Sequence, residues 1–355
     1  MKNKIKILHA RVETAGQGIN SVNGLRKNGF YADMLVWNKN IYADEPDIDL
    51  HISSKNIYIL PFYCIKIFLF FIRAIKKYNV MHFHSRTSLL RNSFDCYLYK
   101  YLKIKTFSEF HGSDIRFLFN NNVKYQFYKN NTNNTNNSSK YRRRVRRITN
   151  NVDGIILHDY ELDEHLPIEI NRSNVYHVPL RVKVNEIKAN YPDKTKEDKP
   201  IIVHAPSNRS EKGTDQILEA LKKVKSEYEL VLVEGKTHDE AMEIYSKADI
   251  VIDQISLGTY GVFAIEAMAM GKPVITYMSD DMIERMPDTL PIISSDFDSL
   301  PSVVEKLIND PQLRYNKGVL GRKYVERYHD HIKVTALLSK IYVGNIENND
   351  LFQLL

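Results

Sequence analysis

The sequence lacks the residues and patterns of several large protein classes. Only two of its 355 residues are cysteines, Cys64 and Cys96, which excludes a disulfide scaffold and is typical of a reducing compartment. The longest apolar run follows Pro61 and is interrupted by Lys66 and Arg73, so it falls short of the ~20 apolar residues that a membrane-spanning helix needs. The opening MKNKIKILHA has no signal-peptide pattern. We therefore expect a cytoplasmic protein.

Positive charge is concentrated in the first half of the chain. Residues 200–355 contain 17 Lys and Arg against 24 Asp and Glu, whereas residues 1–199 contain 33 against 19. A basic first half suggests that this half meets something anionic, such as a membrane surface, a lipid-linked phosphate or nucleic acid. Drift in a Lys- and Asn-rich proteome is the alternative, but it does not explain why the excess is confined to one half.

Short apolar runs alternate with helical patterns in both halves, which favours parallel sheets covered by helices. The strands are expected at residues 5–9, 32–37, 56–60, 80–84, 106–110, 154–157, 201–204, 229–233, 250–253, 273–277 and 290–293. We expect helices near residues 19–28 and 62–78, the second apolar on most sides and wedged against the sheet. This pattern predicts an α/β fold with two doubly wound, Rossmann-like domains.

The polar stretches predict the domain boundaries. We expect a first domain over residues 1–185, a linker over 186–199 and a second domain over 200–320. The asparagine-rich residues 130–139 have nothing to bury, so we expect a surface loop or a disordered insert there. A helical tail over residues 321–355 is expected to pack back on the first domain.

The block from His204 to Pro273 carries most of the chemical signal. HAPSNRSEKGT places Arg209 and Lys212 on a loop after an apolar strand, and GVFAIEAMAMGKPVI places Glu266 near the start of a helix. Two cations beside a glycine suit a diphosphate, and a carboxylate can accept hydrogen bonds from ribose hydroxyls. The amides of Tyr260, Gly261 and Val262 precede the same helix, where N–H groups favour phosphate.

This block resembles the C-terminal domain of the retaining GT-B glycosyltransferases of the large family 4, the group 1 type. The first half resembles them more loosely, through AGQG near the start and EFHGSD at residues 109–114. The resemblance implies a GT-B fold, with the two domains facing across a cleft. It also implies a hexosyltransferase-type activity that moves a sugar from a nucleotide donor with retention at the anomeric carbon. The nucleotide-sugar is then a substrate, and no metal or other cofactor is required.

The resemblance also implies roles for individual residues. Arg209 and Lys212 would hold the diphosphate, and Glu266 would bind the ribose. The first glutamate of the family's E-x7-E motif is missing, because Gly258 stands in its place. Each of these residues also has a structural alternative. Arg209 and Lys212 could be exposed cations in a loop, and Glu266 could be an acid that the dipole of its helix favours.

Two further segments are candidates in the first half. By the resemblance, His111 lies beside the transferred sugar, and Asp114 orients its loop or caps a helix. Gly16 and Gly18 would bring amides towards the diphosphate or the acceptor, although a bare G-x-G is also typical of a tight turn. A lone histidine is often structural, so that alternative stays open for His111.

The run YRRRVRR is a candidate membrane or lipid-diphosphate contact. Its arginines cannot all face a core, and a solvated basic helix is the alternative. These arginines are Arg142, Arg143, Arg144, Arg146 and Arg147. We expect no nucleic-acid binding, because no aromatic platform accompanies the run.

The leading hypothesis is a glycosyltransferase, cytoplasmic or peripheral at the inner face of the membrane. It would use a UDP-sugar and build a surface polysaccharide or glycolipid. A catalytically silent sugar-nucleotide-binding partner of a glycan-assembly complex is the first alternative, and a sugar-nucleotide epimerase on the same fold is the second.

Overall fold

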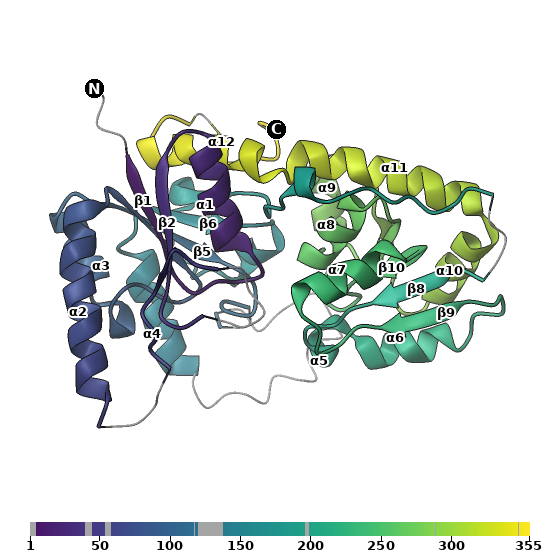
Figure 1. Cartoon of the computed structure of the whole chain (residues 1–355), viewed down its shortest axis with the longest axis horizontal. Helices are drawn as coiled ribbons and strands as arrows, with labels where there is room; N and C mark the ends of the chain where they lie inside the picture. The colour runs from purple at the N-terminus through teal and green to yellow at the C-terminus, as the bar shows by residue number, and fades with distance from the viewer. Residues whose placement is uncertain are drawn as a thin grey trace. The chain divides into compact units, whose positions relative to one another are not determined.

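A computed structural model gives the fold of the chain. It describes residues 5–39, 45–53, 58–116, 118–119, 138–195, 199–287, 289–346 and 348–355. Most of the insert predicted at residues 130–139, and part of the 186–199 linker, lie outside the described residues. Two compact units are present: the first contains the described residues up to 119, 138–181 and His331–Leu355, and the second contains Val182–Asp330 (Figure 1).

The first unit is built on a parallel sheet with the strand order β3-β2-β1-β4-β5-β6-β7. Neighbouring strands pair in parallel, as the alternating pattern predicts. The strands are β1 Lys6–Arg11, β2 Tyr31–Val36, β3 Ile48–Asp49, β4 Val80–His84, β5 Lys105–Phe110, β6 Gly154–Leu157 and β7 Val175–His177. The helices of this unit are α1 Gln17–Lys27, α2 Leu60–Lys77, α3 Cys96–Tyr101, α4 Ser138–Thr149 and α12 His331–Val343.

Helices cover both faces of this sheet. Alternate residues of β1 enter two different cores: Ile7 packs with α1 and α12, whereas Leu8 packs with α2 and α3. The last helix lies directly against the first (Figure 1). A Cβ at Gly24 would lie 2.4 Å from the carbonyl oxygen of His331, so only glycine allows α1 and α12 to approach this closely.

The second unit has a parallel sheet with the strand order β12-β11-β10-β8-β9. Its strands are β8 Ile201–His204, β9 Glu229–Leu232, β10 Ile250–Ile252, β11 Val274–Thr276 and β12 Ile293–Ser294. Its helices are α5 Arg209–Lys212, α6 Thr214–Leu221, α7 His238–Ser246, α8 Val262–Ala269, α9 Asp280–Arg285, α10 Leu300–Asn309 and α11 Pro311–Tyr328. The two parallel sheets and their helices confirm the predicted α/β class.

Several local predictions were wrong. Residues 58–60 of the strand predicted at 56–60 form a turn and the start of α2, because Pro61 suits the first turn of a helix. The short strands β3 and β7 were not predicted. The helix α2 does pack against the sheet as expected, but only one side of it is buried, through Ile67, Phe71 and Ala74. Among the described residues, no helix is long and apolar enough to cross a bilayer.

Candidate functional site

Two predicted phosphate ligands of the second unit meet at one carboxylate. The Nζ atom of Lys212 lies 2.8 Å from Oδ1 of Asp253, and the amide of Gly261 donates to Oδ2 of the same side chain at 2.9 Å. Lys212 also donates to Oε1 of Gln254 at 2.6 Å. Asp253 and Gln254 directly follow β10, so this cluster lies at the carboxyl end of a central strand, where ligands of open α/β sheets bind.

Local capping holds Lys212 in place. The prediction of a loop for Arg209 and Lys212 was wrong, because they are the first and last residues of the one-turn helix α5. The side chain of Asn208 caps this turn by accepting from the amides of Ser210 and Glu211. Gly213 ends the turn in a left-handed conformation, with φ of 74°.

The backbone of Gly261 lies close to this cluster. A Cβ there would lie 3.3 Å from Nζ of Lys212 and 3.4 Å from Oδ2 of Asp253. Val262 follows as the first residue of α8, so its amide belongs to the start of that helix. The Tyr260 side chain instead points into the core, where its hydroxyl lies 3.1 Å from Nε2 of His329. Only the backbone of Tyr260 is therefore available to a ligand.

Arg209 and Glu266 have other protein partners. The guanidinium of Arg209 is exposed and pairs with Asp215 at 3.0 Å and Glu234 at 3.1 Å. Glu266 accepts from Nε2 of His238 at 2.8 Å. The structure thus brings Lys212 and Gly261 together, and it gives Arg209 and Glu266 surface contacts of their own.

In the first unit, polar side chains line the carboxyl end of one sheet face. Along β1, Ile7 is followed on the same face by His9, and along β4 Val80 is followed by His82 and His84. Strand register places His9 beside His82. It also places His84 beside Glu109 of β5. These side chains are fully buried.

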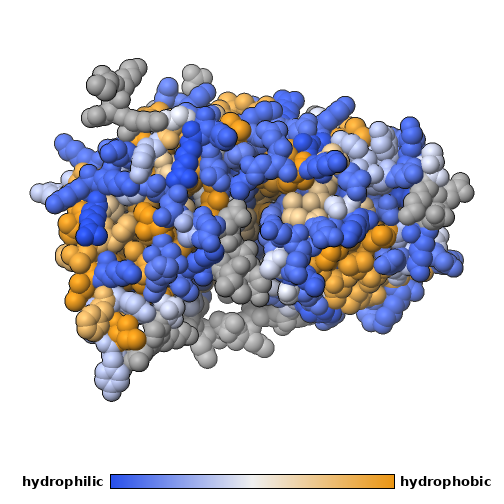
Figure 2. All heavy atoms as spheres, in the orientation of Figure 1, coloured by the Kyte–Doolittle hydropathy of each residue, from blue (hydrophilic) through white to orange (hydrophobic). Residues whose placement is uncertain are grey.

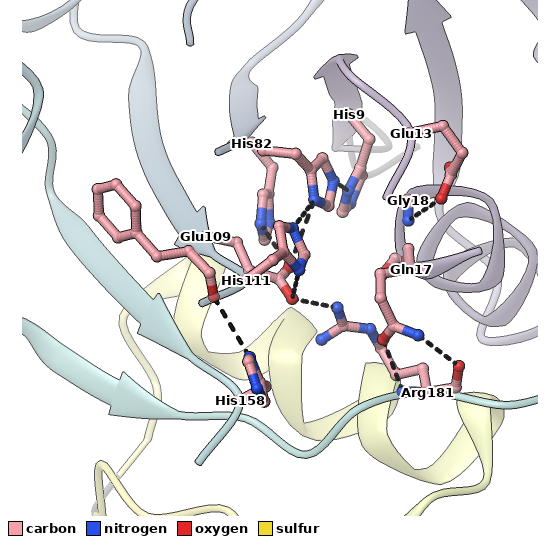
Figure 3. Close-up of polar contacts among 12 residues, drawn as sticks. His9, Glu13, Gln17, Gly18, His82, Glu109, His111, His158 and Arg181 are labelled. Atoms are coloured by element: carbon pink, nitrogen blue, oxygen red, sulfur yellow. Dashed lines mark hydrogen bonds and ion pairs between the residues drawn. The ribbon is translucent and has the colours of Figure 1, made fainter. Parts of the chain in front are cut away.

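A buried ion pair organises this cluster. Arg181 and Glu109 are both fully buried and form a salt bridge. Burial by itself would raise the pKa of Glu109, but the Arg181 guanidinium and the neighbouring histidines hold it well below its usual value. Gln17 anchors the backbone of Arg181, accepting from its amide at 2.8 Å and donating to its carbonyl at 3.2 Å (Figure 3). Glu109 is therefore an anion inside the sheet layer.

The histidines form a chain of close polar contacts that starts at this anion. Nε2 of His82 lies 3.0 Å from Oε2 of Glu109, and Nδ1 of His82 lies 2.6 Å from the Tyr342 hydroxyl of α12. That hydroxyl lies 3.3 Å from Nε2 of His9. Nδ1 of His9 then contacts Nε2 of His84 at 3.0 Å, and Nδ1 of His84 contacts Nε2 of His111 at 3.0 Å.

We infer one arrangement of protons from the shortest of these contacts. Burial lowers the pKa of each of the four histidines, so the rings are neutral at pH 7. Three histidine nitrogens face the Glu109 carboxylate: Nε2 of His82 at 3.0 Å, Nδ1 of His84 at 3.8 Å and Nδ1 of His111 at 4.0 Å. Only the first is within hydrogen-bonding distance, so we assign a proton to Nε2 of His82. Each later contact then needs one donor and one acceptor. The Tyr342 hydroxyl donates to Nδ1 of His82 and accepts from Nε2 of His9. Nε2 of His84 then donates to Nδ1 of His9, and Nε2 of His111 donates to Nδ1 of His84. We infer that Nδ1 of His111 is an acceptor.

His111 itself is set by its loop. Asp114 accepts from the amide of His111 at 3.0 Å and from that of Gly112 at 2.9 Å, so its carboxylate holds the turn after β5. His158 lies near the same strand end, 3.4 Å from the carbonyl of Phe110 (Figure 3). Burial favours the neutral form of His158, but the negative charge of Asp159 has the larger effect and raises the pKa of His158.

Gly18 has a structural role. Its amide and that of Ile19 donate to the carboxylate of Glu13, at 3.3 and 2.9 Å, so an acidic side chain of this chain occupies the start of α1 (Figure 3). A Cβ at Gly18 would lie 2.7 Å from both Glu13 and Met34. Gly16 adopts a left-handed conformation, with φ of 77°, before the helix. Burial raises the pKa of Glu13 to about 7.

Two sets of side chains have the spacing of metal ligands. His9, His82 and His84 form one set, and His84, Glu109 and His111 form the other, with ligand atoms within 4.8 Å of one another. Imidazole and carboxylate groups can bind zinc. However, an ion at the second set would face the Arg181 guanidinium, and several of the nitrogens already contact one another. That the reaction needs no metal stays a prediction.

Comparison of the fold with known proteins gives a consistent result. No family model matches the sequence, and no curated protein matches it significantly. Sucrose-phosphate synthase from Thermosynechococcus elongatus is similar in structure, with a TM-score of 0.68 and 15% identity over 96% of this chain and 99% of that chain. HepE of Anabaena in complex with UDP-glucose has a TM-score of 0.65 and 10% identity, over 96% of this chain and all of HepE.

A third solved structure agrees with these two. WaaG, a glycosyltransferase involved in lipopolysaccharide biosynthesis, has a TM-score of 0.62 and 12% identity, covering 96% of this chain and 100% of WaaG. The chain has the GT-B fold. At these identities the likeness confirms the predicted GT-B architecture, and the activity must be argued from the residues.

Several polar residues of this GT-B chain were missed by the sequence analysis. Asp253 was taken as the last residue of a predicted strand, although an acid at the end of a central strand is a signal of a ligand site. His9, His82 and His84 were assigned to strands without a role. Their alternation with apolar residues near strand ends was visible, but their meeting depends on the register between β1, β4 and β5.

Proposed function

We propose that this chain is a retaining glycosyltransferase of the hexosyltransferase type. It would transfer a sugar from a UDP-sugar to a glycan or lipid-linked acceptor during synthesis of a surface polysaccharide or glycolipid. The observation that carries the proposal is the convergence of Lys212 and the Gly261 amide at the end of β10, in a chain with the GT-B fold. HepE, which shares this fold, binds UDP-glucose.

The Lys212 cluster suits the diphosphate of such a donor. An ammonium group has three N–H donors, and Asp253 and Gln254 take two of them. The third is left for a phosphate oxygen, so we infer that Asp253 and Gln254 position Lys212. The amides at the start of α8 would add further donors. A charge-assisted hydrogen bond to phosphate contributes about 1.5–3 kcal/mol, and it also stabilises the charge that develops on the leaving diphosphate.

Arg209 and Glu266 would complete the donor site. The ion pairs of Arg209 with Asp215 and Glu234 are exposed, and exposed pairs contribute little to stability, so a phosphate could replace them. Glu266 uses one carboxylate oxygen for His238 and keeps acceptor capacity for ribose hydroxyls. Both roles come from the family resemblance together with this geometry.

His111 would contact the transferred sugar through Nδ1. Because Nδ1 is an acceptor in the inferred proton arrangement, its partner must be a donor, and a sugar hydroxyl meets that requirement. A phosphate or carboxylate oxygen would not. Retention in this proposal needs no protein nucleophile, since catalysis would depend on orientation and on stabilisation of the leaving diphosphate.

Donor binding and turnover provide the test. Purified protein is screened for binding and hydrolysis of UDP-, GDP-, ADP- and CMP-sugars, and then for transfer to crude glycolipid acceptors. Lys212→Ala should weaken binding of one nucleotide class by at least about tenfold, as expected for the loss of a charged hydrogen bond. Lys223→Ala removes an exposed lysine of the same unit and is the matched control.

The outcomes separate the alternatives. Transfer with the anomeric configuration kept, and unaffected by EDTA, supports the full proposal. Binding without turnover favours a catalytically silent partner, and donor isomerisation without acceptor favours an epimerase. Absence of binding to every nucleotide-sugar, with a correctly folded protein, contradicts the proposal.

A further inference from the structure

Two helices of the first unit expose large apolar side chains on a single face. On α2, Phe62, Ile65 and Leu69 recur at helical spacing and point away from the buried strip, and Phe68 lies beside them. On α3, Tyr97 and Tyr101 are exposed, and Tyr101 keeps 83% of its accessible surface. These six residues are called the α2–α3 face.

The α2–α3 face is continuous because the two helices are neighbours. Phe71 of α2 and Tyr99 of α3 enter the same core, with ring centroids 6.0 Å apart. Figure 2 shows apolar side chains gathered over the region where Figure 1 places these helices. Single exposed apolar residues are ordinary, but a patch of aromatic and aliphatic side chains marks a surface with a binding role.

Cations interleave with this face. Lys66, Arg73 and Lys76 lie on the exposed side of α2, at helical spacing from Phe62 and Leu69. Residues 58–77 contain no Asp or Glu, and residues 91–103 contain only Asp95, which is buried. An apolar strip flanked by Lys and Arg without exposed acids is typical of helices that lie in the membrane interface.

The arginine-rich helix α4 extends the same surface. Arg147 of α4 stacks on Phe94, with its guanidinium 4.0 Å from the ring centroid. Arg144 donates to Oδ1 of Asn92 at 2.9 Å. Arg146 is neutralised by Glu169 at 2.7 Å, and α4 itself contains no acid. These contacts place the basic run next to α3, so its charge adds to that of the α2–α3 face.

We propose that the α2–α3 face docks on an anionic lipid bilayer. Phe62, Ile65 and Leu69 enter the boundary between headgroups and acyl chains, while Lys66, Arg73 and Lys76 extend to the lipid phosphates. A second copy of the chain is a poor partner, because its own α2–α3 face would oppose cations to cations without acids between them. The bilayer supplies both the apolar layer and the negative charge.

This inference deepens the proposed function, since a lipid-linked acceptor lies at a membrane, but its test does not depend on sugar transfer. The full chain is sedimented with vesicles of phosphatidylcholine alone and of phosphatidylcholine with phosphatidylglycerol, at low and at physiological salt. We expect binding to the anionic vesicles that weakens as salt rises. A protein that binds vesicles but no nucleotide-sugar would refute the proposed function and leave the docking face intact.

Variants locate the contact. Phe62→Ser/Leu69→Ser should reduce the partition onto anionic vesicles by about tenfold or more, because two large side chains no longer enter the bilayer. Both residues are exposed, so the fold should be preserved. Val343→Ser is the matched control, since Val343 is 49% exposed in the same unit but lies on α12, which covers the other face of the sheet. Arg73→Gln/Lys76→Gln should weaken binding to anionic vesicles only.

A spectroscopic measurement tests insertion directly. The chain has one native tryptophan, Trp37, so the Phe62→Trp variant adds a reporter whose fluorescence lipids with brominated acyl chains should quench. Lack of vesicle binding by the wild-type chain would overturn the proposal, as would equal binding by Phe62→Ser/Leu69→Ser. Sedimentation velocity could instead show a dimer that the double variant abolishes, without any vesicle binding. That result would assign the α2–α3 face to a second copy of the chain and would also overturn the proposal.

Discussion

Removal of Arg181 tests the energetic basis of the polar cluster in the first unit. Arg181 and Glu109 are both completely buried, and Arg181 supplies the only full positive charge recorded next to this carboxylate among the described residues. Arg181→Met keeps most of the side-chain volume and leaves Glu109 without its counter-charge. Breaking a buried pair from one side costs about 3–5 kcal/mol. We expect a loss of that size in the free energy of unfolding of the first unit.

The chain offers a convenient probe for this measurement. Its one tryptophan, Trp37, belongs to the first unit, so urea denaturation followed by tryptophan fluorescence reports that unit. Glu109→Gln is the complementary variant, and it leaves the Arg181 charge buried instead. The double variant removes both charges and should be less destabilised than the sum of the two single variants, because neither charge is left alone.

The pH dependence gives a second readout with a defined sign. In the wild type, the pKa of Glu109 is well below its usual value, so the pair stabilises the fold above about pH 4.5 and the stabilisation is lost as the pH falls below that. In Arg181→Met, burial dominates and should raise this pKa, so stability should fall as the pH rises from 5 to 8. The reasoning would be refuted if Arg181→Met lowered the free energy of unfolding by less than about 1 kcal/mol. It would also be refuted if the loss in the double variant equalled the sum of the losses in the two single variants.

Two further predictions concern the same unit. In 15N NMR spectra, each of the four contacting histidines should carry its proton on Nε2; these are His9, His82, His84 and His111. The Tyr342→Phe variant should shift the His111 signals and leave those of His158 unchanged. An Nδ1–H form of any of the four in the wild type would contradict the inferred arrangement. Burial raises the pKa of Glu13 to about 7, so the folded state binds more protons than the unfolded state between about pH 4.5 and 7. The contribution of this carboxyl to the free energy of unfolding is therefore greatest at low pH and falls by about 2–3 kcal/mol across that range. In urea denaturation, Glu13→Gln should flatten the dependence of the unfolding free energy on pH. An unchanged pH dependence would show that another group causes it.

The sequence predicted the elements that depend on local pattern. The apolar runs that became β1, β4 and β5 were located to within about two residues. The two-residue strand β3 and the three-residue strand β7 were missed, since runs this short have little detectable alternation. The helix start at Leu60 was missed because the apolar residues before Pro61 also suit a strand.

The candidate site was predictable only in part, because its contacts are not local. HAPSNRSEKGT and GVFAIEAM indicated Lys212 and Gly261, but nothing in the sequence showed that Asp253 joins them. His111 was indicated by its motif, whereas Tyr342, far along the chain, was not. A hydrogen-bonded partner of this kind is identified by its three-dimensional position and leaves no periodic signal.

The arrangement of the first sheet keeps the docking face and the polar cluster apart. His9, His82 and Glu109 lie on the sheet face that packs with α1 and α12, whereas Phe62 and Leu69 lie on a helix that covers the opposite face. Ser substitutions at Phe62 and Leu69 therefore change no contact of the histidines. If the protein acts on a lipid-linked acceptor, these substitutions should lower transfer to acceptor in vesicles while hydrolysis of a soluble nucleotide-sugar stays unchanged. An equal loss of both activities would mean that the two faces are coupled through the sheet.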